Sequence, residues 1–303
     1  MEILITGGAG FIGSHLAASI SNVEHNITLL DLPGEFPESV TSKYKIIECD
    51  ITETDKVLSL PRFDVIYHLA GQVGTAGSLK NLSKDLMWNS LGTLNIVQLA
   101  IKTGVKKLIF SSSMAVYGHA ENAAEEWGRY PRSPYGISKV CAEEYVKYCQ
   151  VKSPNTQCVT FRIYNCYGPG QSTKNLTKGL ASIFLEQVKN GNKIDVTGSL
   201  YRRRDLIFID DVINALLLPI DNNNIKGTFN VCSGESTRIK DLIDEIIKIS
   251  KKDSSEFVLR NIGGAVEDPE AATGNNEKIK MYGWEPSVSL PEGLKICWDL
   301  INE

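Results

Sequence analysis

The sequence lacks several features that would place it in a common class of proteins. Its 303 residues contain no run of about 18 or more apolar residues, so no membrane span is expected. The formal net charge is −4, which argues against nucleic-acid binding because that function needs a concentrated basic surface. The N-terminus has no basic segment followed by a long apolar region, so no secretory signal is expected.

Cysteine and histidine are present, but they form no disulfide or metal-binding pattern. The seven cysteines are odd in number, none belongs to a Cys-x-x-Cys pair, and the four histidines are scattered. Several cysteines lie in apolar runs, as buried thiols do in proteins of a reducing compartment. We therefore expect a cytoplasmic protein without a metal ion.

The first two-thirds of the chain alternates short apolar runs with helical stretches. Strands are predicted at residues 2–6, 27–31, 45–48, 65–69, 107–111 and 158–163. Helices are predicted near residues 12–21, 54–59, 90–103 and 135–152. Nearly continuous apolar strands are typical of parallel strands that are covered on both faces. The pattern predicts a Rossmann-type α/β fold, a doubly wound parallel sheet, whose ligands bind beyond the carboxyl ends of the strands.

The character of the chain changes after the Tyr-Gly-Pro-Gly segment at 167–170. Further elements are expected at residues 178–190, 194–196, 206–219 and 239–251. We predict a Rossmann domain over residues 1–165 and a smaller, interleaved C-terminal α/β lobe for the substrate over 166–303. A segment at about 205–233 is expected to return to the Rossmann domain, so the boundary is not a linker.

A glycine-rich turn lies between the first predicted strand and the first predicted helix. Gly7 and Gly10 permit a tight turn and a close approach of the backbone to a pyrophosphate, and Gly13 lets the helix pack against the strand. The helix begins at Phe11 and Ile12, and its free N–H groups and positive dipole end suit phosphates. The spacing is GxxGxxG rather than GxGxxG, so a purely structural turn is the alternative.

A carboxylate, Asp31, ends the second predicted strand, 18 residues after Gly13. At that place it can accept hydrogen bonds from both hydroxyls of a ribose and would repel a 2′-phosphate. Asp31 therefore favours NAD over NADP as the cofactor. An ordinary turn aspartate is the alternative interpretation.

Two further strand ends fit the same cofactor. After the third strand, Asp50 can meet the adenine amino group while Ile51 covers the ring. The fourth strand is followed by residues at which the backbone must approach the cofactor, Leu69, Ala70 and Gly71. The neighbouring His68 can equally be a core histidine with its hydrogen bonds satisfied, and we assign it no chemistry.

Tyr135 and Lys139 form a Tyr-x-x-x-Lys pair after a helix start at Ser133-Pro134. The spacing of four places both side chains on one helical face. A free tyrosine has a pKa of about 10, and a nearby ammonium together with a positively charged nicotinamide would lower that pKa. Tyr135 can then take a proton from a sugar hydroxyl while hydride passes to the cofactor.

The Tyr-x-x-x-Lys pattern alone also occurs by chance on solvated helices. Three serines at 111–113 lie just past an apolar strand, and one of them can hydrogen-bond the same substrate oxygen. A serine-rich turn at a strand end is the alternative. The order of glycine turn, carboxylate, serine and Tyr-x-x-x-Lys is far more specific than any one of these parts.

In this order the motifs resemble the extended short-chain dehydrogenase/reductase family, in its nucleotide-sugar epimerase/dehydratase branch and most closely its UDP-glucose 4-epimerase type. The resemblance covers nearly the whole chain. Its marks are TGGAGFIGSH at 6–15, Asp31, CDI at 49–51, HLAG at 68–71, Asn89 with LGTLN at 91–95, SSSMAVYG at 111–118, SPYGISK at 133–139, FRIYNCYGPG at 161–170, RDLIFIDDV at 204–212 and GWEP at 283–286.

The resemblance implies a catalytic Ser-Tyr-Lys set at Ser113, Tyr135 and Lys139, with Ser112 as the fallback for the serine. Tyr135 and Lys139 would also bind NAD, Lys139 through the nicotinamide ribose. Asn89 is placed among the residues that bind NAD.

The resemblance also implies contacts to the substrate, by Ser113 and Tyr135 at the sugar and by Asn165 and Arg204 at the diphosphate. A bidentate guanidinium suits the diphosphate. The arginines next to Arg204 in sequence, at 202 and 203, are expected to be solvated.

The chain departs from the family before GWEP, where relatives usually carry an Arg-Pro-Gly-Asp-like stretch with an arginine for the second phosphate. Arg260 is the candidate for that role, followed by a loop with Glu267, Asp268 and Glu270. We expect the acidic loop to be a solvated surface turn, with an unusual sugar as the alternative.

The residues after Ser113 bear on the reaction. Dehydratases of this branch usually carry Thr-Asp-Glu where this chain has Ser113-Met114-Ala115, and eliminating water needs an acid and a base that Met and Ala lack. The same segment argues, less firmly, against a uronate decarboxylase. We predict an NAD-dependent nucleotide-sugar 4-epimerase, for UDP-hexose or UDP-N-acetylhexosamine, that acts through a 4-keto intermediate with Tyr135 as base.

The family resemblance also leaves two alternative functions open and implies an oligomeric state. An NDP-4-keto-sugar reductase is the first alternative, although such reductases prefer NADPH, and a non-catalytic nucleotide-binding relative is the second. Relatives commonly dimerise through the helices that correspond to about 90–103 and 135–151, so a homodimer is expected. Val140, Cys141 and Tyr148 suit such a face or the core equally well.

Overall fold

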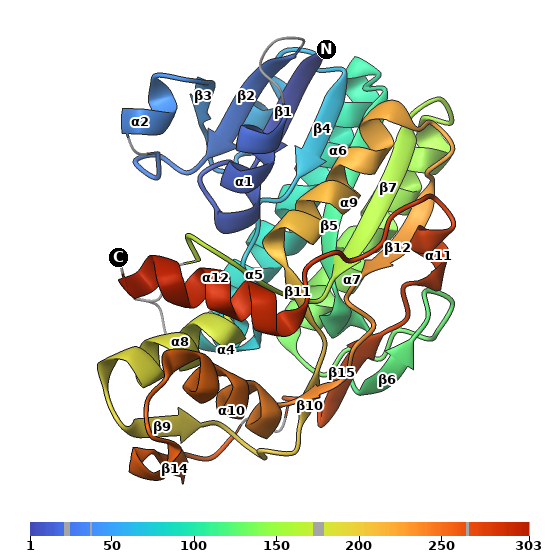
Figure 1. Cartoon of the computed structure of the whole chain (residues 1–303). Coiled ribbons are helices and arrows are strands. Elements are labelled where there is room, and N and C mark those ends of the chain that lie inside the picture. Colours follow the sequence, from blue (N-terminus) through green and yellow to red (C-terminus); the bar gives the residue numbers. More distant parts are fainter. Residues whose placement is uncertain (21–24, 37, 172–178, 265–266, 303) are drawn as a thin grey trace.

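The computed structural model describes residues 1–20, 25–36, 38–171, 179–264 and 267–302, and one large parallel sheet dominates it (Figure 1). Its strands lie in the order β12-β7-β5-β4-β1-β2-β3. Their bounds are Glu2–Thr6 for β1, Asn26–Asp31 for β2, Lys45–Glu48 for β3, Val65–His68 for β4, Lys107–Ser113 for β5, Gln157–Ile163 for β7 and Gly227–Val231 for β12. All six strands predicted from the sequence are present, and the predicted Rossmann-type fold is confirmed. The strand order reverses at β1, where folds of this kind bind their ligands.

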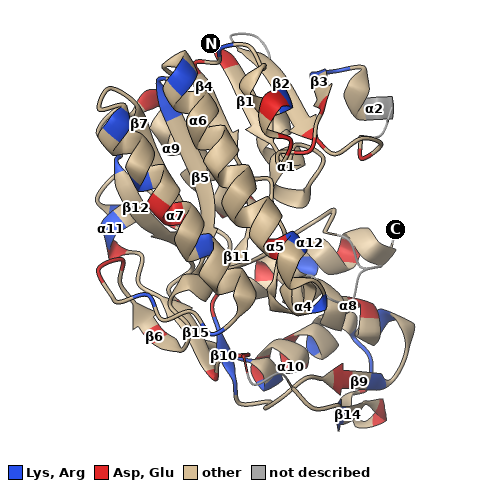
Figure 2. Ribbon diagram, turned by 180° about the vertical axis from the view of Figure 1, so that it is seen from behind, with Lys and Arg blue, Asp and Glu red and all other residues tan. Residues whose placement is uncertain are grey.

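Successive residues of the central strands pack on opposite faces of the sheet. In β1, Ile3 and Ile5 belong to one hydrophobic cluster and Leu4 to the other, and all three are fully buried. The helices that cover the faces are α1 (Phe11–Ser19) and α9 (Ile209–Asp221) on one side, and α3 (Thr54–Leu58), α6 (Gly92–Thr103) and α7 (Pro134–Lys152) on the other (Figure 1, Figure 2). Each buried aliphatic side chain contributes about 1.5–3 kcal/mol, so these layers supply much of the stability. The predicted end of the first helix, residue 21, lies outside the described residues.

The helix predicted at 90–103 begins differently in the structure. It is α6, and it continues from α5 (Leu82–Leu86) through a π-helical turn, η1 (Met87–Leu91). The π turn adds a residue to the helical repeat, and such turns are frequent at functional sites. Here it carries Asn89 and Ser90, both buried, toward α7.

The C-terminal part of the chain builds a lobe of small sheets and helices below the large sheet in Figure 1. Its strands are β13 (Thr237–Arg238), β10 (Arg203–Arg204), β15 (Ala271–Gly274) and β6 (Ala120–Ala123) in one sheet, and the pairs β11 (Leu206–Phe208) with β8 (Asn165–Tyr167) and β14 (Val258–Asn261) with β9 (Lys193–Val196). Its helices include α8 (Leu180–Asn190), α10 (Ile239–Ser250) and α12 (Leu290–Asn302). The shorter helical segments of the chain are α2 (Glu38–Thr41), α4 (Thr75–Lys80), η2 (Met114–Val116), η3 (Ser254–Glu256) and α11 (Glu277–Lys280).

The two parts of the chain exchange segments. The predicted element at 206–219 divides into strand β11 and helix α9, and α9 packs on the large sheet. Strand β12 is the edge strand of that sheet, beside β7. In the opposite direction, β6 joins the sheet of the lobe through β15. Residue 178, where the next helix is predicted to begin, is outside the described residues.

The described residues form no helix that is long and apolar enough to cross a membrane. All seven cysteines are free, and five of them are buried. Within the described part of the chain, no three His, Cys, Asp or Glu side chains are grouped so that they could hold a metal ion.

Candidate active site

The glycine turn after β1 is held in a conformation that excludes side chains. Gly7 has a φ of +73°, and its N–H donates to the Leu30 carbonyl at 2.8 Å. A Cβ built on Gly7 would lie 2.8 Å from the Ala70 nitrogen, and a Cβ on Gly13 would lie 2.1 Å from the Gly7 oxygen. These close approaches bring the carboxyl ends of β1 and β4 together at the start of α1. Gly10, the N-cap of α1, offers no side-chain cap, so the first N–H groups of the helix are free for an anion.

Asp31 lies beside this turn at the end of β2. Its carboxylate accepts hydrogen bonds from the Ala9 N–H at 3.0 Å and from the Leu32 N–H at 2.9 Å. Burial raises the pKa of Asp31, although both backbone hydrogen bonds oppose the rise. The structure therefore places the predicted ribose carboxylate next to the predicted phosphate site.

Asp50 and Ile51 follow β3, and both are held by neighbouring residues. The Asp50 carboxylate accepts hydrogen bonds from the backbone and the hydroxyl of Thr52, each at 2.9 Å, and from the Trp88 indole at 3.3 Å. Ile51 is buried against Gly92, where a Cβ would lie 2.4 Å from the Ile51 Cδ1 atom. The carboxylate and the aliphatic side chain are thus fixed at adjacent positions near the strand end.

His68 at the end of β4 is a core histidine. Its ring nitrogens lie 2.8 Å from the Thr6 hydroxyl and 2.9 Å from the Thr93 hydroxyl. Burial, with a contribution from the charge of Lys139, lowers the pKa of His68 to about 3, so the ring is neutral. Leu69, Ala70 and Gly71 follow it, as predicted, at the edge of the glycine turn.

Gly71 and Asn89 meet beside Lys139. A Cβ on Gly71 would lie 2.4 Å from the Asn89 Oδ1 atom and 3.7 Å from the Lys139 Nζ atom. The Asn89 amide donates to Asp85 at 3.1 Å and to Ser138 at 3.0 Å, but its buried Oδ1 atom has no hydrogen-bond partner among the described residues. A buried acceptor without a partner is unfavourable and is suited to a ligand or a water molecule.

Ser113, Tyr135 and Lys139 come together where β5 meets α7. Ser113 is hydrogen-bonded to Tyr135, and the Lys139 Nζ atom lies 6.0 Å from the centre of the Tyr135 ring. Lys139 donates to the Ser111 carbonyl at 3.0 Å. Ser133 caps α7 by accepting from the Gly136 N–H at 3.1 Å, so the predicted helix start is present.

The protein alone makes Tyr135 a weak acid. Burial raises the pKa of the Tyr135 phenol to about 12, against the effect of its hydrogen bond with Ser113. Burial also lowers the pKa of Lys139 to about 8, while the charges of Asp85 and Glu143 oppose that fall. The sequence argument expects a low pKa of Tyr135 from a nearby ammonium together with a positively charged nicotinamide, and the protein alone does not produce that low pKa.

The structure distinguishes the two candidate serines by their partners. Ser112 donates to the Glu143 carboxylate at 2.7 Å, so its hydroxyl proton is already used within the protein. Ser113 lies on the Tyr135 side of β5. The next two residues, Met114 and Ala115, form η2, and neither has a group that can exchange a proton.

Asn165 and Arg204 lie in the lobe, at the beginning of β8 and in β10. The Asn165 amide donates to the Asp205 carbonyl at 2.8 Å. Arg204 is buried, and its guanidinium forms an ion pair with Asp268 at 2.5 Å. Burial and the charge of Arg202 lower the pKa of Arg204 to about 10.

One expectation about this region is wrong. Arg202 is not solvated: it is buried, and it forms an ion pair with the same Asp268 that binds Arg204. Asp268 pairs with both arginines and is still 32% exposed, and Glu270 of the same loop is exposed. The pairing of β10 with β15 brings the two segments together, which no local sequence signal indicates.

Arg260 lies on β14, and its side chain is about half exposed. Its guanidinium makes two hydrogen bonds with Asp195, at 2.6 and 2.8 Å. It lines a surface cavity of about 530 Å³, together with Gly198, Leu200, Tyr201 and Leu259. A Cβ on Gly198 would lie 3.3 Å from the Arg202 guanidinium carbon, so this cavity adjoins Arg202.

Sequence reasoning missed two buried carboxylates near Lys139. Asp85 and Glu143 are each 1% exposed. A spacing of four was available as a signal, because Asp85 precedes Asn89 by four residues and Glu143 follows Lys139 by four. Without the fold, these residues read as part of a solvated helical face.

Known proteins resemble this chain over nearly its whole length. A model of the NAD dependent epimerase/dehydratase family matches residues 3–232. A dTDP-4-dehydro-6-deoxyglucose reductase of Escherichia coli is 32% identical over 309 residues, covering 96% of this chain and 95% of the relative.

Two solved structures have the same fold throughout. The UDP-glucose 4-epimerase of Thermotoga maritima, with UDP-glucose, superposes with a TM-score of 0.89 and 31% identity, over 100% of this chain and 99% of that one. The UDP-glucuronic acid 4-epimerase of Bacillus cereus, with UDP-glucuronic acid and NAD, has a TM-score of 0.90 and 27% identity, with the same coverage.

Proposed function

Because the chain belongs to the NAD-dependent epimerase/dehydratase family, we propose that it is a nucleotide-sugar 4-epimerase for UDP-hexose or UDP-N-acetylhexosamine. The observation that carries the proposal is the combination of Asp31 beside the glycine turn with Ser113, Tyr135 and Lys139 at one place. Asp31 favours NAD, which an epimerase keeps and regenerates in each cycle.

The residues at the carboxyl ends of β1, β2 and β4 fit NAD. The glycine turn leaves backbone N–H groups for the pyrophosphate, and Asp31 suits a ribose without a 2′-phosphate. Asn89 has a buried acceptor without a protein partner beside Lys139, where a nicotinamide ribose or an ordered water would bind. When it is bound, NAD supplies the hydride acceptor and then the hydride donor.

Tyr135 is the base in the proposed reaction. It removes the proton of the sugar 4-hydroxyl while Ser113 hydrogen-bonds the same oxygen, and loss of hydride from C4 leaves a 4-keto sugar. The protein alone gives Tyr135 a pKa of about 12, because burial outweighs the hydrogen bond with Ser113, and the positive charge of a bound oxidised nicotinamide would lower that pKa. After the ketone turns over, hydride returns to its other face and Tyr135 gives the proton back.

The two buried arginines and the adjoining cavity suit the rest of the substrate. Arg204 and Arg202 provide two fixed positive charges for a diphosphate, and the single carboxylate of Asp268, which pairs with both, balances only one of them. The cavity beside them is lined by Leu200, Tyr201 and Leu259 and is suited to a nucleobase. Arg260 lines this cavity, but its pairing with Asp195 makes it a weaker candidate for a phosphate.

A reductase of an NDP-4-keto sugar is the second candidate. It is favoured by the 32% identity with an E. coli enzyme that reduces a dTDP-4-dehydro sugar. Elimination of water is disfavoured, because Met114 and Ala115 provide neither an acid nor a base beside Ser113. A purely binding role would leave the Tyr135→Phe variant fully functional.

We also infer that the protein is a homodimer. Apolar side chains are exposed on α5, η1 and α7, among them Leu82, Leu86, Met87, Ile137 and Tyr148. The expected contact residues Val140 and Cys141 on α7 are half-buried. Exposed apolar side chains on helices that contact one another are unfavourable in water and are typical of an interface.

Mass spectrometry of the small molecules released on denaturation tests the proposal. Protein purified in cofactor-free buffer is expected to release about one NAD per chain, with any trapped nucleotide-sugar naming the substrate. Interconversion of that nucleotide-sugar with its 4-epimer should then follow without added cofactor. Protein that releases no nicotinamide but binds added NADPH would overturn the epimerase proposal in favour of the reductase.

A further inference from the structure

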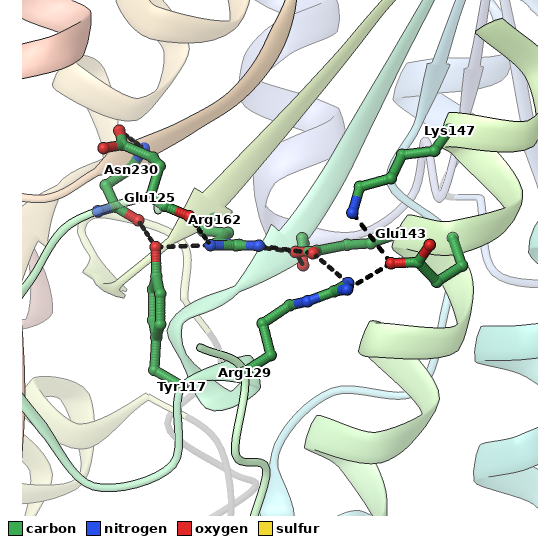
Figure 3. Close-up of polar contacts among 9 residues, drawn as sticks. Tyr117, Glu125, Arg129, Glu143, Lys147, Arg162 and Asn230 are labelled. Carbon is green, nitrogen blue, oxygen red and sulfur yellow. Dashed lines mark hydrogen bonds and ion pairs between the residues drawn. The ribbon is translucent and has the colours of Figure 1, made fainter. Parts of the chain in front are cut away.

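A buried polar network lies next to Ser113 and Lys139 in the chain and joins α7 to the large sheet (Figure 3). We call it the Glu143 network, and its members are Ser112, Tyr117, Arg129, Glu143, Arg162 and Asn230. They come from β5, the segment after it, α7, β7 and β12. None of the proposed contacts to cofactor or substrate uses any of these side chains.

Glu143 is the centre of the network and is 1% exposed. Its carboxylate accepts from the Ser112 hydroxyl at 2.7 Å and from Nε and Nη2 of Arg162, each at 2.8 Å. Arg129 adds a further contact at 3.2 Å. Both carboxylate oxygens are therefore bound, which is the condition under which a buried charge is tolerated.

Arg162, on β7, extends the network from helix α7 into the large sheet. Its Nη1 group donates to the Tyr117 hydroxyl at 2.7 Å and to the Glu125 carbonyl at 3.1 Å. The Tyr117 hydroxyl donates in turn to the Asn230 Oδ1 atom at 2.8 Å. Figure 3 shows this line of contacts running across the sheet from α7 to β12. A planar, bidentate pair permits little sliding or rotation of the two elements that it joins.

Three successive turns of α7 contact three successive residues of β5. Tyr135 contacts Ser113, Lys139 contacts the Ser111 carbonyl, and Glu143 contacts Ser112. Tyr135, Lys139 and Glu143 lie four residues apart, so they share one face of the helix. The contact of Glu143 is the only one of the three that contributes no proposed chemistry.

We propose that Glu143 and Arg162 are positioning residues, whose buried pair sets the rotation and axial position of α7 and thereby the contacts of Tyr135 and Lys139 with β5. The inference rests on the proposed function for its kinetic test, but its structural test does not depend on the substrate. The negative charge of Glu143 also opposes the lowering of the pKa of Lys139 by burial, together with Asp85 on α5.

Two variants with conservative substitutions test the proposal. Ser112→Ala removes one hydrogen bond to Glu143 and no charge, and Glu143→Gln keeps the shape while it breaks the pair with Arg162. The matched control is Glu144→Gln, because Glu144 is the next residue, is exposed and also pairs with Arg129. We expect kcat to fall at least tenfold in both variants, with KM and bound NAD within twofold of the wild type. The control should retain full kcat.

Crystal structures of the NAD-bound Ser112→Ala and Glu143→Gln proteins give the readout that is independent of activity. The expected result is a displaced α7 with a longer Tyr135–Ser113 or Lys139–Ser111 contact. Unchanged contacts in folded variants would overturn the proposal, whatever the enzyme's substrate proves to be. If the wild type and the control turn over but both variants do so equally well, the positioning role is wrong while the proposed function stands.

Discussion

The buried Lys139 lowers the stability of the folded protein at neutral pH, at the position proposed to serve catalysis. Its ammonium is buried, and burial lowers its pKa from 10.5 to about 8. The folded protein therefore holds the Lys139 proton less tightly than the unfolded chain does. Burial of the charged Lys139 therefore lowers the free energy of unfolding by its full amount below pH 8. This destabilisation disappears as the pH rises from 8 to 10.5.

The substitution Lys139→Met is expected to stabilise the fold and abolish activity. The difference between the two pKa values corresponds to about 3 kcal/mol, as an upper bound, in the free energy of unfolding at pH 7. Urea denaturation at pH 7 and pH 10 measures it, and the gain should shrink at the higher pH. Lys147→Met is the control, because Lys147 is exposed and its ion pair is with the exposed Glu144. Equal stability of Lys139→Met and wild type at pH 7 would contradict the argument.

The arginines of the lobe differ in burial, and their substitution should separate their roles. Arg204→Ala is expected to raise the KM for the nucleotide-sugar at least tenfold, because it removes a buried cation from the proposed diphosphate site. Arg260→Ala should change KM less than threefold, since Arg260 is exposed and paired with Asp195. Steady-state kinetics measure KM for both variants. A larger increase in KM for Arg260→Ala than for Arg204→Ala would indicate that Arg260 binds the phosphate.

At the scale of elements, the turn between β1 and α1 requires glycines, because a Cβ atom at Gly13 would collide with the backbone. A Cβ on Gly13 would lie 2.1 Å from the Gly7 carbonyl oxygen, closer than any non-bonded contact allows. Gly13→Ala must therefore push α1 away from β1 and open the predicted phosphate site. Bound NAD is expected to fall below about a tenth of the wild-type amount, as measured by mass spectrometry of the denatured protein.

Gly191→Ala provides a control for the effect of adding a methyl group to a glycine. Gly191 ends α8, its φ is −174°, and a Cβ there would meet only the Lys193 nitrogen, at 4.0 Å. This variant should keep its NAD and its melting temperature. If Gly13→Ala also kept full NAD, the turn would be less rigid than the contacts indicate.

At the scale of the whole molecule, the exposed apolar face of α5, η1 and α7 predicts a dimer. Leu86→Glu places a charge on that face and is expected to yield monomers in sedimentation velocity, with the fold preserved by circular dichroism. Met281→Glu, at a more exposed position near α11, should leave the assembly unchanged. A monomeric wild type would contradict the inference directly.

The large sheet and the cofactor motifs could be predicted because their signals are local. Nearly continuous apolar strands, the glycines at 7, 10 and 13, and Asp31 each report a constraint within a few residues of the chain. Tyr135 and Lys139 share a face because a helix repeats every 3.6 residues, about the spacing between them. The main exception within a predicted element is η1, whose extra residue has no sequence signal.

Contacts between distant segments were decided by tertiary structure. Ser112 and Ser113 have the same chemistry. Only the packing of α7 on β5 decides that Ser112 binds Glu143 while Ser113 binds Tyr135. Likewise, Arg204 meets Asp268 because β10 pairs with β15, although 64 residues separate them.

The sequence by itself therefore determined the fold, the family resemblance and the positions of the proposed catalytic and NAD-binding residues, since backbone geometry and helical periodicity act over short distances. Only the folded chain decided which charges are buried and what neutralises them. Arg202 is an example: in sequence it is one of three consecutive arginines, and only the sheet of the lobe buries it against Asp268. A charge can be buried only where a partner is brought to it, and that partner is supplied by the fold.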